Sequence, residues 1–193
     1  MPDGEKAVKV ACCDDFIYAL SLNNRVFVSP AQNILSFTEV NELIGKNIID
    51  ISGTSCHCLA VDKEGHAYSQ GDDYSGCLGL GVRTIKISTF KQIESLNKFK
   101  IVAAYAGLNH SLFQASEGQI FSCGNNTYGQ LMSGIPKDVN ICYPSYTSIS
   151  SGASFCIAGS SVTIVFCGYV PSNSPNIRVN DFKIKEEASS SLQ

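Results

Sequence analysis

The chain has 193 residues and a mass of 20.7 kDa, enough to bury a hydrophobic core without disulfides or metals. Its 14 basic and 17 acidic residues give a net charge of −3 and are mixed along the sequence, so we predict no binding to nucleic acid or to a membrane surface. No apolar run approaches the roughly 18 to 20 residues that cross a bilayer, and the first residues lack a signal-peptide core. We therefore expect an intracellular, cytoplasmic protein, with a nuclear or cytoskeletal location also open.

The first 40 residues alternate short apolar runs with turn signals, which is typical of β-strands. One run covers residues 8–12 and a second begins at Phe16. Asn24 follows the second run and precedes a third. Asn tolerates positive φ, so we expect a tight hairpin turn at Asn24. A fourth, short segment begins at Phe37.

The same succession returns further along the chain. Each later unit has a β-rich opening, a second strand that ends at a turn, a third strand, a variable loop and a last segment that begins with an aromatic residue. The openings are 48–51, 101–104 and 146–149, and the last segments are 90–93, 146–149 and 182–184, so that 146–149 serves in both roles. No helical period lasts longer than about two turns, so we expect little helix.

An internal repeat of 53 residues underlies this succession. Residues 57–81 and 110–134 share nine identities in 25 positions, where chance at about 6% per position would give one or two. Two weaker copies flank this pair. We assign to the scaffold the positions His57, Gly65, Gly71, Gly76, Gly81, His110, Gly118, Gly124, Gly129 and Gly134.

Four strands per copy are the geometry of a β-propeller blade. We predict an all-β chain of β-propeller-type blades, each of four antiparallel strands, forming a partial or small propeller of about four blades. One propeller-like domain is expected over 8–184, and a polar tail over 185–193. The expected blades are 8–45, 46–98, 99–144 and 145–184.

Two stretches, one in each middle copy, resemble the repeat of the regulator of chromosome condensation family. One is Gly107-x-x-His110-Ser111-Leu112 followed by Glu117-Gly118-Gln119-Ile120-Phe121-Ser122-Cys123-Gly124 to Gly129-Gln130-Leu131, and the other runs from Ile51-Ser52-Gly53 through Gly76-Cys77-Leu78-Gly79-Leu80-Gly81. The resemblance implies a propeller, usually of seven blades. Its members act as guanine-nucleotide exchange factors for a small nuclear GTPase, or as docking modules on ubiquitin ligases, kinases and cytoskeletal proteins. This chain departs from the pattern in having four copies, and in Cys77 where the family usually has Gln.

The recurring histidines and the cysteines beside them suggest a catalytic or metal site at first sight. A residue that recurs at one place in successive blades more often ties the blade's own strands together, so we assign His57 and His110 to structure. Cys56 and Cys58 lack the second spaced pair that zinc sites generally have. The number of cysteines is odd, at nine, and their contexts are apolar, which favours reduced, buried thiols. We predict no metal, no cofactor and no catalytic residues, with a metal-dependent enzyme as the least favoured alternative.

The loops between strands vary between copies, and binding residues concentrate in such loops. Their side chains suit a protein surface more than a small-molecule pocket. We therefore predict a non-enzymatic protein–protein interaction or scaffold module, with guanine-nucleotide exchange on a small GTPase as the alternative. Protein partners would cover the loops or the blade ends, and a second copy of the chain and a small GTPase are the candidates. The candidate interaction residues are Tyr74, Arg83, Lys86, Tyr128, Lys137 and Asp138.

Overall fold

The computed structural model describes residues 1–33, 36–82, 84–131, 140–142, 147–159, 163–169 and 182–183. Almost all regular structure in these residues is β-strand. The exceptions are three single turns of 3-10 helix, η1 (Pro2–Gly4), η2 (Asn41–Leu43) and η3 (Glu94–Leu96). Within the same ranges, no helix has the length and apolar character needed to cross a membrane.

The strands form four antiparallel sheets of four strands, and in each sheet the strands pair in chain order. The prediction of an all-β chain built from four-stranded propeller blades is thereby confirmed. The first blade contains β1 (Ala7–Cys12), β2 (Phe16–Ser21), β3 (Val26–Pro30) and β4 (Thr38–Glu39), and the second contains β5 (Ile48–Gly53), β6 (His57–Asp62), β7 (Ala67–Asp72) and β8 (Lys86–Gln92). The third contains β9 (Ile101–Ala106), β10 (His110–Ala115), β11 (Ile120–Gly124) and β12 (Asn140–Cys142), and the fourth contains β13 (Ser148–Ser151), β14 (Phe155–Gly159), β15 (Thr163–Gly168) and β16 (Phe182–Lys183).

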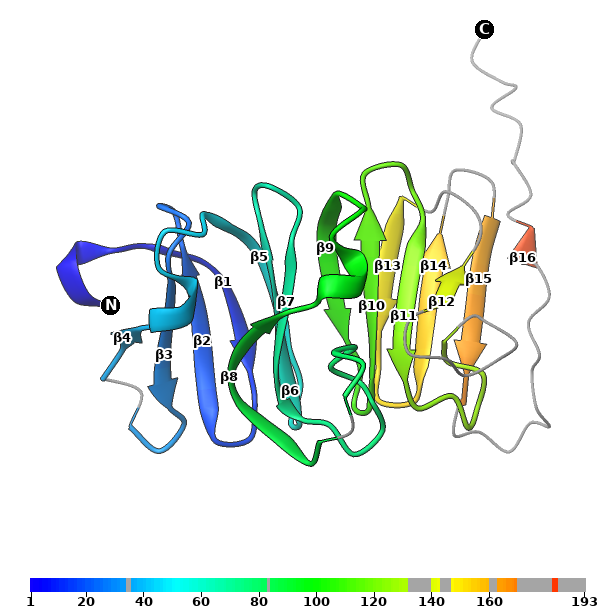
Figure 1. The fold of residues 1–193 in the computed structure, drawn as a ribbon, viewed down its shortest axis with the longest axis horizontal. Coiled ribbons are helices and arrows are strands. Elements are labelled where there is room, and N and C mark those ends of the chain that lie inside the picture. Colours follow the sequence, from blue (N-terminus) through cyan, green and yellow to red (C-terminus); the bar gives the residue numbers. More distant parts are fainter. Residues whose placement is uncertain are drawn as a thin grey trace, which may run out of the picture.

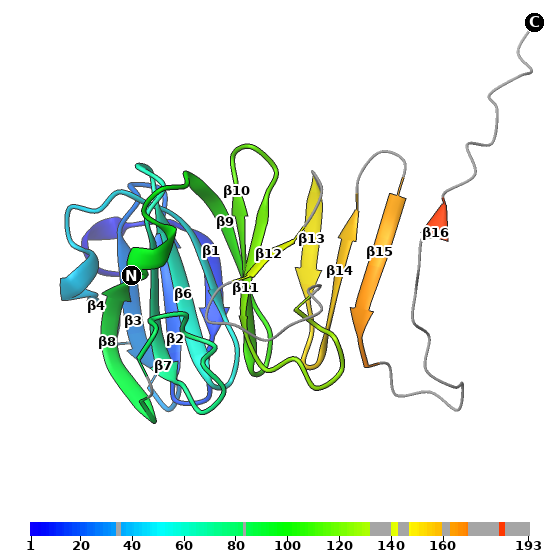
Figure 2. The same cartoon turned by 45° about the vertical axis from the view of Figure 1, so that its right-hand side comes forward.

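The four blades stand side by side in an arc (Figure 1). The first strand of each blade contacts the first strand of the next, so β1, β5, β9 and β13 follow one another along the arc. The first and fourth blades lie at opposite ends of the molecule, and the turned view shows the fourth blade diverging from the others (Figure 2). The arc therefore presents two terminal blade faces.

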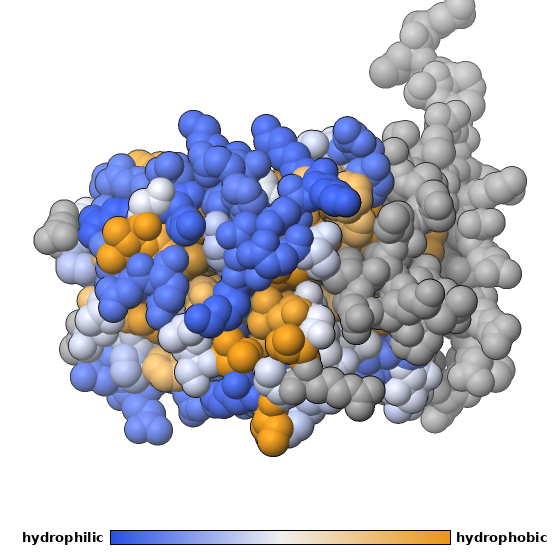
Figure 3. Space-filling view, in the orientation of Figure 1, coloured by the Kyte–Doolittle hydropathy of each residue, from blue (hydrophilic) through white to orange (hydrophobic). Residues whose placement is uncertain are grey.

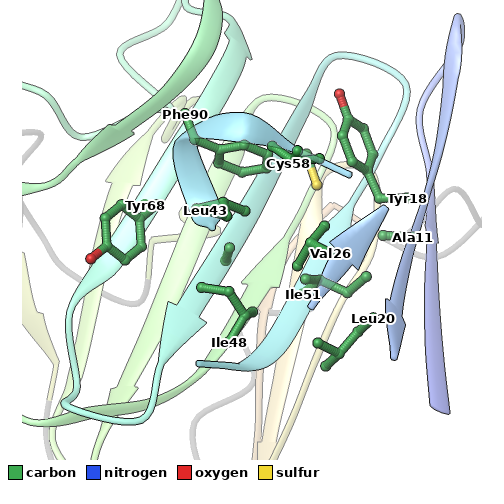
Figure 4. Packing of buried hydrophobic residues seen from close by; sticks show 12 residues of the cluster. Ala11, Tyr18, Leu20, Val26, Leu43, Ile48, Ile51, Cys58, Tyr68 and Phe90 are labelled. Carbon is green, nitrogen blue, oxygen red and sulfur yellow. The ribbon is translucent and has the colours of Figure 1, made fainter. Parts of the chain in front are cut away.

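The hydrophobic core consists of three clusters, one at each interface between blades. Between the first and second blades, Tyr18, Leu20 and Val26 pack against Ile48, Ile51 and Cys58 (Figure 4). The strand β6 serves two interfaces, because Cys58 and Ala60 face the first blade while Leu59 and Val61 face the third. All six residues of β6 are buried, which explains its nearly continuous apolar sequence.

The turns between second and third strands use left-handed backbone. Asn24 has a φ of 61°, Gly65 of 98° and Gly118 of 87°. Asn is one of the few residues other than glycine that visits this region routinely. At Gly65 a side chain would also meet neighbouring backbone, because a Cβ would lie 2.8 Å from the Cα of Lys100. Asn can therefore take the place of glycine at this turn only in a blade where the neighbouring chain leaves room for its side chain.

The closing strand of the third blade was predicted wrongly. Residues 146–149 do not close that blade, since β11 pairs with Asn140–Cys142. Ser148 and Ile149 instead belong to β13, which opens the fourth blade, and Tyr146 lies outside the described residues. An aromatic residue before an apolar run fits both kinds of strand, and only the pairing partner distinguishes the two.

Candidate interaction surface

The third strand of each of the last three blades ends at a glycine that closes tightly on its neighbour. Gly71, Gly124 and Gly168 have φ of 121°, 107° and 120°, a region that side chains rarely adopt. At Gly124, a Cβ would overlap the carbonyl oxygen of Asn109 and lie 2.8 Å from the Cα of His110. These glycines therefore fix the point at which the chain leaves the third strand.

An exposed tyrosine lies shortly after each of these glycines, three residues after Gly71, four after Gly124 and directly after Gly168. Tyr74 is 77% exposed, Tyr128 52% and Tyr169 46%. The strands that precede the tyrosines, β7, β11 and β15, end at the same edge of their blades, which is the lower edge in Figure 1. The rings of Tyr128 and Tyr169 lie 4.9 Å apart although they belong to different blades. A row of aromatic side chains thus follows this edge from the second blade to the fourth.

The first two tyrosine loops are held by the same pair of hydrogen bonds. In the second blade, the amide of Leu78 donates to Asp73 (2.9 Å) and the hydroxyl of Ser69 donates to the carbonyl of Leu78 (2.8 Å). In the third blade, Leu131 donates to Asn126 (2.9 Å) and Ser122 to the carbonyl of Leu131 (2.8 Å). Both leucines are fully buried.

Ser69 with Ser122 and Leu78 with Leu131 are among the nine identities of the repeat, whereas position 73 is not and its role was missed. Asp73 and Asn126 differ in name, yet both offer a side-chain oxygen to the same amide 53 residues apart. A comparison of acceptor chemistry, rather than identity, would have found this clamp. The clamp matters because it holds the loops of Tyr74 and Tyr128 in place.

The two recurrent histidines lie inside the interfaces between blades. His57 Nε2 lies 2.7 Å from the hydroxyl of Ser111, and His110 Nε2 lies 2.9 Å from the hydroxyl of Ser151. Neither histidine has more than 1% of its surface exposed. Burial lowers the pKa of each imidazole to about 4, so both are neutral near pH 7.

The pairing of His57 with Ser111 has the composition of a nucleophile and its base, but the direction of its hydrogen bond is unsuitable. The hydroxyl of Ser111 donates to the carbonyl of Cys77 at 2.7 Å, so it accepts from His57 Nε2–H. His57 is therefore protonated at Nε2 and cannot take the proton of Ser111. The pair is also sealed from substrate, because Ser111 is fully buried.

The remaining candidate residues fall into three groups. Lys86 was expected in a loop, but it is the first residue of β8, where it lies exposed and 3.5 Å from Asp72. The strand begins earlier than predicted because residues 86–92 pair with β7. Gly76, Gly81 and Gly129 have φ near 76°, 69° and 82° and open space around them, as surface turns require. Arg83, Gly134, Lys137 and Asp138 lie outside the described residues.

Apolar side chains accompany the tyrosines. Val82 and Ile85 are both exposed in the segment that leads into β8. In the space-filling view, hydrophobic surface appears near the lower edge of the second blade, below a mostly hydrophilic upper part (Figure 3). Across the residues that the structure describes, no group of three or more His, Cys, Asp or Glu side chains is arranged to hold a metal ion. The surface has the mixed aromatic and apolar character of a protein-binding site.

The blade geometry and the repeat can be compared with known proteins. The family model for the regulator of chromosome condensation (RCC1) repeat matches residues 101–130. The regulator of chromosome condensation of Xenopus laevis is 35% identical over 108 residues, covering 56% of this chain and 24% of that protein. The secretion-regulating guanine nucleotide exchange factor of Bos taurus is 25% identical over 173 residues, covering 86% of this chain and 37% of that protein.

The fold is also shared with solved structures. Prp20p of Saccharomyces cerevisiae, whose structure was described with its binding to Gsp1p and histones, superposes with a TM-score of 0.70 at 21% identity, covering 88% of this chain and 45% of Prp20p. The chain thus spans less than half the length of each of these proteins. The 53-residue repeat, the four-stranded blades and these matches show RCC1-type repeats on a propeller-type fold, with the family model matched over residues 101–130.

Proposed function

We propose that the chain is a non-enzymatic protein-interaction module that binds a protein partner through the tyrosine loops of its lower edge. The observation that carries this proposal is the row of Tyr74, Tyr128 and Tyr169, each exposed shortly after the third strand of three successive blades. Tyrosine combines a large apolar ring with a polar end and loses little side-chain entropy on binding, which makes it a frequent anchor of interfaces.

The hydrogen bonds that hold these loops support the same proposal. Two of the three loops are clamped to buried leucines, and the hydroxyl of Ser75 bridges the Tyr74 loop to the carbonyl of Asn109 in the third blade (2.9 Å). Loops that are ordered before binding lose less conformational entropy when the partner arrives. An enzymatic role finds no support in the histidines, since their ring nitrogens are buried and His57 already donates to Ser111.

Guanine-nucleotide exchange on a small GTPase is the alternative. It is favoured by the name of the bovine relative and by the binding of Gsp1p described for Prp20p. Both proteins are more than twice as long as the matched part, so the activity of the whole protein does not transfer by resemblance. In either case the partner is a protein that meets the blade loops.

The test replaces the three tyrosines by alanine and compares this triple variant with Leu22→Ala, which removes an exposed apolar side chain from the β2–β3 hairpin at the opposite end. Proteins captured from extract by the wild-type chain are quantified by mass spectrometry, and the affinity of each is then measured by calorimetry. We expect the triple variant to weaken binding by at least about 30-fold, since one interface tyrosine contributes on the order of 1–2 kcal/mol. Leu22→Ala is expected to change nothing.

Equal recovery of every captured protein by the wild type and the triple variant would contradict the proposal. The release of fluorescent GDP from purified small GTPases distinguishes nucleotide exchange from docking. Faster release in the presence of the chain would favour exchange, whereas binding without release would favour a docking module.

We further propose that a protein covers the terminal blade faces, a second copy of the chain being the simplest occupant. Val10 in β1 is 59% exposed, whereas Ile51 at the corresponding place in β5 is fully buried against the first blade. In the fourth blade Ile157 is 38% exposed, whereas Leu112 at the corresponding place is fully buried. Each terminal face thus presents side chains of the type that its internal counterparts bury.

This proposal predicts a solution mass above that of one chain, measured by light scattering during size exclusion. Val10→Lys and Ile157→Lys should each lower that mass, because a charge at the centre of an apolar contact is costly to bury. A strict monomer that melts cooperatively would contradict it.

A further inference from the structure

The thiol of Cys13 lies across the interface between the first two blades. Cys13 follows β1, and its side chain packs against the cluster that joins these blades. Its sulfur is 3.6 Å from the carbonyl oxygen of His57, and a Cβ at Gly53 would lie 3.1 Å from it. Gly53 is the register partner of Cys58. The missing side chain at Gly53 therefore gives Cys13 its place beside Cys58.

Cys58 is the buried partner of this thiol. It is 1% exposed in the middle of the interface, and its sulfur points toward Tyr18 and the first blade (Figure 4). A hydrogen bond from the thiol of Cys58 lowers the pKa of Cys13, whereas burial raises the pKa of Cys58 well above its usual value. Cys13 is only partly buried. The thiol of Cys13 is thus accessible to solvent and the more readily ionised, whereas the thiol of Cys58 is buried next to it.

We propose that Cys13 and Cys58 form an oxidisable pair, which hydrogen peroxide converts into a disulfide that joins the first blade to the second. The thiolate of Cys13 attacks one peroxide oxygen, the O–O bond breaks, and a sulfenic acid and hydroxide form. The sulfur of Cys58 then attacks the sulfur of Cys13, the S–O bond breaks, and its oxygen leaves as water. Two thiols are oxidised and one peroxide is reduced to two waters.

The other thiols of the described chain are less suited to this chemistry. Cys12 adjoins Cys13 in sequence and is exposed, but it is paired with Ile17 in the same blade. Cys156 and Cys167 face each other across β14 and β15, so their union would cross-link only strands that are already hydrogen-bonded. Cys77 and Cys123 also meet across an interface between blades, since the sulfur of Cys123 lies 3.3 Å from the carbonyl oxygen of Cys77, but both residues are buried. A Cys13–Cys58 disulfide would bridge two blades through a pair in which one thiol is partly exposed. It would also close a loop long enough to restrict the unfolded chain substantially.

The experiment treats the reduced chain with a small excess of hydrogen peroxide and maps the products by peptide mass spectrometry under non-reducing conditions. We expect a loss of two hydrogens, about 2 Da, and a linked peptide pair containing Cys13 and Cys58. The oxidised chain should melt about 5–10 °C higher, and dithiothreitol should reverse the shift. Cys13→Ser and Cys58→Ala should each abolish the link and the shift, whereas Cys12→Ser, the matched control, should retain both.

Three results would overturn the inference. They are a gain of oxygen on Cys13 with no link to Cys58, a dominant link between other cysteines, and a linked product whose melting temperature equals that of the reduced chain. Cys13→Ser changes a partly exposed side chain, so its fold is expected to persist. Its melting curve in the reduced state provides the check.

Discussion

Gly124→Ala is expected to destabilise the chain by about 3–5 kcal/mol, a large part of the stability of a domain this size. The φ of 107° at this position is unfavourable for any side chain. The new methyl group would also overlap the carbonyl of Asn109 and approach the Cα of Cys77 to 3.1 Å. Since these are backbone atoms of two blades, neither can move without opening the interface between them. Urea unfolding followed by circular dichroism measures the effect.

Gly129→Ala is the matched control for this prediction. Gly129 lies in the same blade and has a φ of 82°, but nothing lies within 4 Å of the place where its Cβ would stand. This substitution therefore reports the backbone strain alone, which costs about 1–2 kcal/mol. Equal destabilisation by the two substitutions would show that the close approach of the strands at Gly124 contributes nothing.

Acidification from pH 7 to pH 4.5 is expected to destabilise the chain by on the order of 4 kcal/mol through His57 and His110 together. Burial holds the pKa of both at about 4, below the value of about 6.5 in the unfolded chain. The unfolded state therefore takes up protons first, so stability is complete above pH 6.5 and is lost as the pH falls toward 4. The midpoint of urea unfolding, measured across this range, gives the slope.

The double variant His57→Gln with His110→Gln separates the histidines from the carboxylates. Glutamine keeps an N–H donor near the position of Nε2 but does not titrate, so the slope between pH 6.5 and pH 4.5 should nearly vanish. Hydrogen bonds lower the pKa values of Asp62 and Glu39, so the stability that these carboxylates contribute to the fold is lost only as the pH falls through their lowered pKa values. Burial raises the pKa of Asp73, so protonation of this carboxylate at low pH favours the folded state instead. An unchanged slope in the double variant would assign the acid sensitivity to other groups.

Much of the candidate surface could be predicted because it follows from the repeat. The loop position of Tyr74 and Tyr128 was read from the 53-residue offset and the turn glycines, and both side chains are exposed. Tyr169 was missed because it directly follows Gly168, where the second and third copies have Asp72 and Asn125, so the repeat does not single it out. The tilted ring contact between Tyr128 and Tyr169 depends on the relative orientation of two blades, which residue spacing within one copy does not determine.

By itself, the amino-acid sequence determined the all-β fold, the four blades and the hairpin turns, because strand alternation and turn chemistry are local and are repeated four times. It also indicated that the histidines belong to the scaffold. Only the tertiary structure decided which strand closes the third blade, which partner each histidine meets and which thiols lie together. His57 meets Ser111, and Cys13 meets Cys58, across interfaces between blades. Such contacts join residues that are more than 40 positions apart, and packing between sheets, not local propensity, sets their geometry.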